Sequence, residues 1–231
     1  MAEAIGRDET LRLACYGAPG GRVDREVRQL RQTLLAALGG FLVLLATSPL
    51  ARAGSLEDAV LEEVNFARTH PADYARELRG EQVSGHRGRG WSTLADQDSD
   101  ALDEAIDFLE RQAPLPALRG DGRLAASAFD HASVQGPRGE LGHGGPGGAT
   151  FSQRLKREGV WAGLAAEAIS YGYDSPRDVV RQLVIDSGVP SRGHRRDIFG
   201  RSYQVAGVSC ARHALWGAMC VIDFAGALVA R

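Results

Sequence analysis

The second half of the chain holds four side chains that could do chemistry together, two histidines and two carboxylates. His143 lies between glycines, Glu167 follows a short apolar stretch, and His194 lies in a Gly-His-Arg turn. Asp186 stands between the last two in sequence. Two imidazoles and two carboxylates are a reasonable ligand set for a divalent metal ion or a reasonable acid–base set, provided that the fold brings them together.

The chemistry of this set favours a borderline ion. Neutral imidazole nitrogens suit Zn²⁺, and the carboxylates would either complete its coordination shell or hold the imidazole tautomers by hydrogen bonds. A coordination position left open for water would permit hydrolysis, with Glu167 or Asp186 activating the water. The sequence has no Gly-x-Ser-x-Gly motif to supply a serine nucleophile. The same four residues could instead form a hydrogen-bonded network that only fixes loops.

The order and the residues of these segments resemble those of a known family, the CAP superfamily. It contains cysteine-rich secretory proteins, antigen 5 and plant pathogenesis-related proteins, with many bacterial members. The resemblance runs from about Leu56 to Ala225. The motifs that carry it are Gly142-His143, Glu167-Ala168-Ile169, the turn Ser191-Arg192-Gly193-His194-Arg195, and a hairpin ending in Val221-Ile222-Asp223-Phe224.

The resemblance implies a three-layer α-β-α fold and a cleft that carries His, Glu, Glu and His. His143, Glu167 and His194 match three of these positions, and Asp186 stands where the family has its second glutamate. The carboxylate is therefore kept but shortened by one methylene. Ala168 and Asp197 stand where the family usually has asparagine, so two amides that could both donate and accept hydrogen bonds are lost.

These observations lead to one expected function and two alternatives. We expect an exported bacterial CAP protein whose cleft, formed by His143, Glu167, Asp186 and His194, binds a divalent metal ion such as Zn²⁺ or a small extracellular ligand. One alternative is a metal-assisted hydrolase of peptide or cell-wall substrates, and the other is a carrier of lipids or sterols. The expected partners are accordingly small molecules, lipids or components of the cell envelope.

The N-terminal part has the pattern of a secretory signal peptide. Arg25, Arg28 and Arg31 precede the apolar run 34–46, and Ala51-Arg52-Ala53 provides a small-x-small cleavage site. The run is shorter than the ~20 residues that a bilayer requires, so no membrane span is expected after cleavage. Signal peptides have short charged regions, so we expect translation to begin at Val23 or Val27 rather than at Met1. The expected location is secreted or periplasmic.

Length and charge restrict the remaining possibilities. The chain has 231 residues and a formal net charge of −2. Removal of residues 1–53 leaves 54–231, which is enough for one domain. No stripe of Lys and Arg is present, and nucleic-acid binding is therefore not expected.

Two cysteines remain in 54–231, Cys210 and Cys220. An even pair in an exported protein predicts a disulfide, and two buried thiols are the alternative. If the flanking strands pair about a centre near Leu215, the two residues face each other across the hairpin.

Helix and strand signals alternate along the domain. Helices are predicted over 55–79, with a further turn starting at Pro71, and after Ser99, Asp121, Thr150 and Ser175, each of which can cap a helix. A surface loop insertion is predicted over 80–99, which is rich in Gly, Arg and Asp. Strands are predicted over 164–171, 204–210 and 216–224, the last two as a hairpin with His213 in an exposed turn. The fold class is therefore α+β, a sandwich with a small, mainly antiparallel sheet. The resemblance to the CAP superfamily implies the same three-layer α-β-α sandwich.

Overall fold

Side chains that cap the first free amides set the helix starts in this chain. The computed structural model describes residues 55–84 and 99–228, which belong to one unit, Ala53–Arg231. Ser55 and Asp58 form a capping box at the start of α2 (Leu56–Thr69), and Thr150 forms another with Gln153 at the start of α6 (Phe151–Arg157). Each box satisfies two backbone N–H groups that the helix leaves without partners.

Two more helices begin at comparable caps. Asp121 caps α5 (Gly122–Arg138), which ends at Gly139 in the left-handed conformation, and Ser175 caps α7 (Pro176–Ile185). The remaining helical elements are α3 (Pro71–Ser84), α4 (Ser99–Arg111), the short 3₁₀ helix η1 (Pro146–Gly148) and α8 (Gly193–Ile198).

Three predictions about the helices need correction. The segment predicted as helix over 55–79 is two helices, because Pro71 lacks an N–H and the chain turns at His70. The second of them continues to Ser84, so helix enters the first residues of the predicted loop 80–99; residues 85–98 lie outside the described ranges. The segment around His194, read as a turn from the sequence, is the helix α8.

The sheet has four strands in the order β1-β3-β4-β2. β4 (Gly217–Ala225) lies between β3 (Val205–His213) and β2 (Ala165–Tyr171), antiparallel to both. β1 (Arg119–Gly120) adds a two-residue parallel edge to β3. The central place of β4 explains its apolar sequence, since both of its faces are covered.

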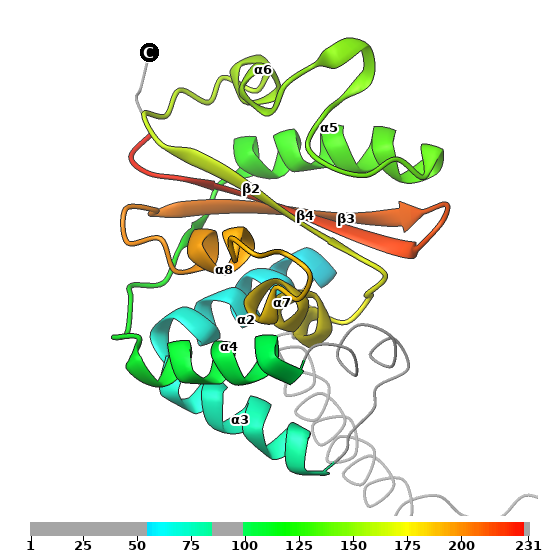
Figure 1. Ribbon diagram of the computed structural model, residues 1–231. Coiled ribbons are helices and arrows are strands. Elements are labelled where there is room, and N and C mark those ends of the chain that lie inside the picture. The colour runs from blue at the N-terminus through cyan, green and yellow to red at the C-terminus, as the bar shows by residue number, and fades with distance from the viewer. Residues whose placement is uncertain (1–54, 85–98, 229–231) are drawn as a thin grey trace, which may run out of the picture. The chain divides into compact units, whose positions relative to one another are not determined.

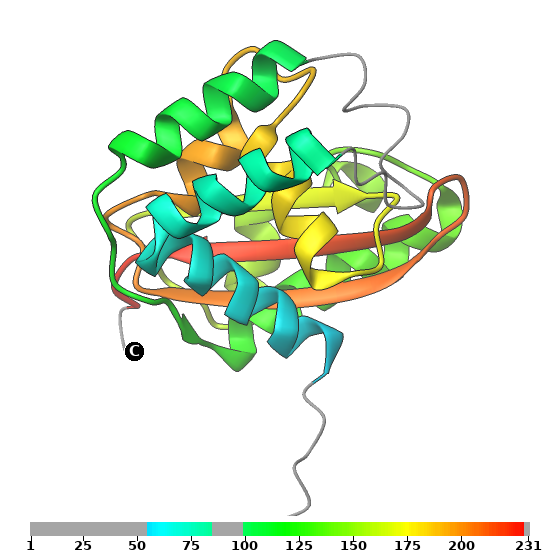
Figure 2. The same cartoon turned by 90° about the horizontal axis from the view of Figure 1, so that it is seen from below.

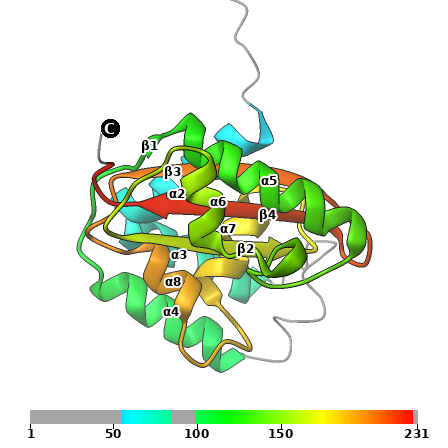
Figure 3. The ribbon, with the colours of Figure 1, turned by 90° about the horizontal axis from the view of Figure 1, so that it is seen from above.

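Helices cover both faces of this sheet, which gives the predicted α-β-α arrangement (Figure 1). On one face α5 lies along the strands with α6 beside it (Figure 3). On the other face lie α2, α3, α4, α7 and α8 (Figures 1 and 2). The main core fills the space between the sheet and this second layer, and it includes Val64, Leu78, Leu109, Leu183 and Phe224.

A disulfide joins the two long strands of the hairpin, as the sequence predicts. Cys210 and Cys220 are register partners on β3 and β4, with their Cα atoms 4.1 Å apart. The hairpin turn, however, is tighter than the sequence suggests. His213 was predicted to lie in an exposed turn, but it ends β3 and is only 2% exposed. Its Nδ1 accepts hydrogen bonds from the backbone amides of Leu215 and Trp216, so the ring itself holds the turn.

Candidate functional site

His143 is held in place by its own loop and by a carboxylate. The loop follows α5, and its carbonyl at Gly142 accepts hydrogen bonds from His131 (2.9 Å) and Gln135 (2.8 Å). Nδ1 of His143 lies 2.9 Å from Oε1 of Glu167 on β2. The His143 side chain is 55% exposed whereas that of Glu167 is 1% exposed. The histidine is therefore presented to solvent from a buried anchor.

Glu167 is the anchor because strong donors surround it. Arg154 on α6 donates to its second carboxylate oxygen and also donates to the backbone carbonyl of His143 (3.0 Å). Burial alone would raise the pKa of Glu167, but the hydrogen bonds from His143 and Arg154 lower it overall. The hydrogen bond to Glu167 in turn raises the pKa of His143. Glu167 therefore stays ionised, and Nδ1 of His143 carries the proton that bonds to it.

The second histidine has an equivalent arrangement built from helix ends. Asp186 ends α7 in the left-handed conformation (φ 56°), and one of its oxygens accepts the backbone N–H of His194 at 2.9 Å. The other oxygen lies 2.7 Å from Nδ1 of His194. Asp186 thus fixes both the start of α8 and the orientation of the ring on it.

Both histidines line one cavity of about 300 Å³. Its walls come from the loop after α5, the end of β2, α7 and the start of α8. They include Ile169, Tyr171, Gln182 and Asp186. The structure therefore brings His143 and His194 to the same cavity, each with its Nδ1 bonded to one carboxylate. This leaves Nε2 as the ring nitrogen that can meet a ligand.

The four predicted residues form two pairs rather than one cluster. In residues 55–84 and 99–228, no group of three or more His, Cys, Asp or Glu side chains lies close enough together to hold a metal ion. The carboxylate oxygens of Glu167 and Asp186 already accept hydrogen bonds from the two histidines, from Arg154 and from backbone amides.

Sequence reasoning missed two residues of the site. Arg154 is 2% exposed, but in a chain so rich in arginine nothing in the sequence distinguishes it. Asp223 faces Glu167 in the pairing of β2 and β4 and is fully buried. Burial raises its pKa well above the ordinary aspartate value, so it adds no second charge beside Glu167. A lone carboxylate in an apolar strand was the signal that could have pointed to Asp223.

The sequence that forms this site matches a known protein family. The model of the CAP family, described as the cysteine-rich secretory protein family, matches residues 61–224. The chain belongs to the CAP family. No curated protein matches it in sequence.

Three solved structures similar to this CAP chain come from bacteria. An extracellular protein with an SCP domain from Bacillus anthracis is 21% identical over 56% of this chain and 40% of its own, with a TM-score of 0.42. An outer surface protein from Borrelia burgdorferi is 21% identical over 57% of this chain and 94% of its own, with a TM-score of 0.42. A cysteine-rich secretory protein from Staphylococcus aureus is 13% identical over 61% and 42%, with a TM-score of 0.37. The CAP chain thus spans less than half of the first and third proteins.

Proposed function

We propose that this chain is an exported CAP protein whose 300 Å³ cavity binds a divalent transition-metal ion through Nε2 of His143 and Nε2 of His194. One observation carries the proposal. The two histidines line the same cavity, and a carboxylate holds Nδ1 of each. Histidines that ligate metals commonly donate their other ring N–H to a carboxylate, which fixes the tautomer and raises the basicity of the donor nitrogen.

In this proposal the carboxylates orient the ligands and do not coordinate the ion. Glu167 and Asp186 fix the two rings, while Arg154 keeps Glu167 in place and ionised. Two nitrogen donors favour Zn²⁺ over hard ions such as Ca²⁺ and leave coordination positions for water or a small extracellular ligand. Bound there, the ion would supply Lewis acidity. The two alternatives, hydrolase and lipid carrier, stay predictions that no contact in the described residues favours over metal binding.

Zinc titration of the full chain tests the proposal. We expect uptake of Zn²⁺ by the wild type and an affinity lower by on the order of 100-fold in His143→Ala and in His194→Ala, since even loss of an orienting partner costs 10–100-fold. His70→Ala is the matched control, because His70 is exposed at the end of α2 and away from the cavity. Its affinity should equal that of the wild type.

Two outcomes would overturn the assignment. If all four proteins take up Zn²⁺ equally, the ion binds elsewhere, and if none does, the two pairs are a hydrogen-bonded brace for the loop after α5 and for α8. Loss of hydrolytic activity on chelation would favour the hydrolase. Binding of an apolar ligand that is indifferent to His143 and His194 would favour the carrier.

Export rests on the N-terminal sequence and on the family. Residues 1–53, which carry the predicted signal peptide, lie outside the described residues. In the described ranges no helix is long and apolar enough to cross a membrane. The family is described as secretory, and the disulfide between Cys210 and Cys220 suits an oxidising compartment.

A further inference from the structure

We propose that a second cavity, at the end of the sheet where β3 turns into β4, binds a small organic cation with an apolar body. This cavity has a volume of about 580 Å³, within the range of small-molecule sites. It shares no lining residue with the histidine cavity. Tyr171 faces the histidine cavity, and the next residues, Gly172 to Asp174, face the second one.

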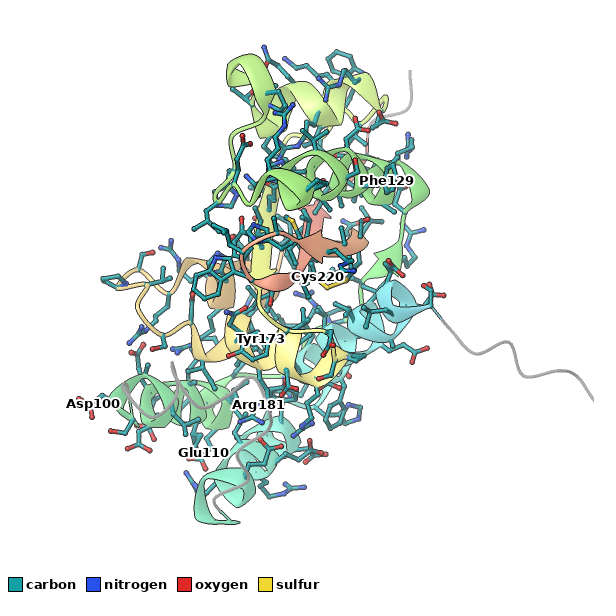
Figure 4. The ribbon with its side chains drawn as sticks, turned by 90° about the vertical axis from the view of Figure 1, so that its right-hand side faces the viewer. Asp100, Glu110, Phe129, Tyr173, Arg181 and Cys220 are labelled. Atoms are coloured by element: carbon teal, nitrogen blue, oxygen red, sulfur yellow. A yellow bond between two sulfur atoms is a disulfide. The ribbon has the colours of Figure 1, made fainter. Side chains whose placement is uncertain are left out.

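The cavity lies between the sheet and the helical layer that contains α2 and α7. Figure 4 looks onto this end of the molecule, with Cys220 in the sheet and Tyr173 on the helical side. The disulfide between Cys210 and Cys220 lines the sheet side, and Leu56 lines the α2 side. The cavity therefore offers apolar surface from two layers.

A half-exposed indole borders this apolar surface. Trp216 is 52% exposed. Its ring passes over Gly172, where an added Cβ would lie 3.9 Å from Cε3 of the indole. A ligand in the cavity would bury apolar surface of this large aromatic side chain, which is favourable. Its π face also attracts cations.

The charges around the cavity select the sign of the ligand. Three carboxylates, those of Glu57, Asp174 and Asp178, line it, against one guanidinium, that of Arg212. Glu57 accepts the backbone N–H of Cys210 at 3.3 Å, and Asp178 accepts the hydroxyl of Ser175 at 2.6 Å. In the described part of the chain neither Glu57 nor Asp174 forms a salt bridge, so their charge is left for a ligand, whereas that of Asp178 already interacts with Arg181. An amine or guanidinium that also stacks on Trp216 would satisfy both features.

The test compares three probes that share one apolar body. 2-Phenylethylammonium is the cation, 2-phenylethanol the neutral analogue and 3-phenylpropanoate the anion. The full chain has three tryptophans, so its indole N–H signals can be followed by NMR, and the signal of Trp216 is the one lost in Trp216→Leu. We expect the cation to shift that signal saturably, the alcohol to bind at least about tenfold more weakly, and the anion to leave it unchanged.

Variants locate the site. Asp174 is exposed, so Asp174→Asn should fold normally and weaken binding of the cation about two- to fivefold. The control Asp130→Asn, on the far face in α5, and His143→Ala, in the histidine cavity, should both bind as the wild type does. Equal shifts from all three probes would indicate apolar adsorption without selection of charge and would contradict the proposal. No shift from any probe would refute the site. Loss of binding in His143→Ala would move the ligand to the histidine cavity.

Discussion

Nδ1 of His143 and Nδ1 of His194 are each bonded to a carboxylate, but the two carboxylates differ in what holds them. Arg154 holds Glu167 from a neighbouring helix. Two backbone amides at the start of α8, those of His194 and Arg195, hold Asp186. The first histidine therefore depends on a charge pair between α6 and β2, whereas the second depends on the local geometry between α7 and α8.

We predict that Glu167→Gln changes the pH dependence of zinc binding. The hydrogen bond to Glu167 raises the pKa of His143, so protons compete with the ion at pH values above the ordinary histidine value of about 6.5. Without the carboxylate that pKa falls, and the pH at which binding is half lost should move down. The affinity at pH 8 should fall by about 10–100-fold, because the ring is less well oriented.

Zinc titrations between pH 5 and 8, with the ring of His143 followed by NMR, measure both effects. Glu62→Gln, an exposed acid on α2, should leave the half-loss pH unchanged. The same half-loss pH in Glu167→Gln and the wild type would contradict the role given to Glu167. Without metal, the raised pKa of His143 affects the pH dependence of folding stability. The raised pKa of His143 contributes to folding stability below pH ~6.5, and that contribution is lost as the pH rises through the folded value.

At the scale of elements, the close packing of α5 on the sheet depends on glycines at the contact, Gly136 on α5 and Gly207 on β3. A Cβ on Gly207 would lie 2.0 Å from the backbone nitrogen of Ala125 and 2.6 Å from Cβ of Leu124. Only a residue without a side chain lets α5 approach β3 this closely.

We predict that Gly207→Ala destabilises the protein by about 3 kcal/mol, the upper part of the range for overpacked sites, because backbone must move. Urea unfolding monitored by circular dichroism measures this. Gly122→Ala is the matched control, since its Cβ would meet no heavy atom within 4 Å, and its effect should stay within about 1 kcal/mol. Equal stabilities of the two variants would show that α5 adjusts freely.

Local signals explain which elements could be predicted from the sequence. Ser55, Asp121, Thr150 and Ser175 each cap a helix because one side-chain oxygen meets a nearby backbone N–H, an interaction that a sequence reveals. α8 has no such signal. It begins after Arg192 in the left-handed conformation, and its first amides bond to Asp186.

Contacts between residues that are distant in sequence could not be predicted from the sequence. Arg68 is fully buried and donates to the carbonyls of Pro116, Ile198 and Gly200, which tie three segments together without any motif. The candidate site likewise has some features that the sequence predicts and others that only the fold shows. The resemblance to the CAP family predicted a site of His143, Glu167, Asp186 and His194, but only the fold shows that a carboxylate faces Nδ1 of each ring.

At the scale of the whole molecule, we predict that the chain is processed after Ala53. A chain started at Val27, read as Met, should yield a secreted product whose first residue is Gly54, because Ala51 and Ala53 give the small-x-small pattern that signal peptidase recognises. N-terminal sequencing of the secreted protein measures this. Ala51→Glu should block processing, and wild-type product that retains residues 34–46 would instead indicate an anchor.

The central position of β4 has a consequence for the order of folding. β4 is the last of the four strands in sequence, yet both β2 and β3 pair with it along their length. Ala165 pairs with Ala225, and Arg119 pairs with Val205. Contacts of such sequence separation make folding slow, and a nascent chain that lacks residues 217–225 cannot complete the sheet. For the export that we propose, a translocation machinery that threads unfolded chains would therefore receive this one before it can close its fold.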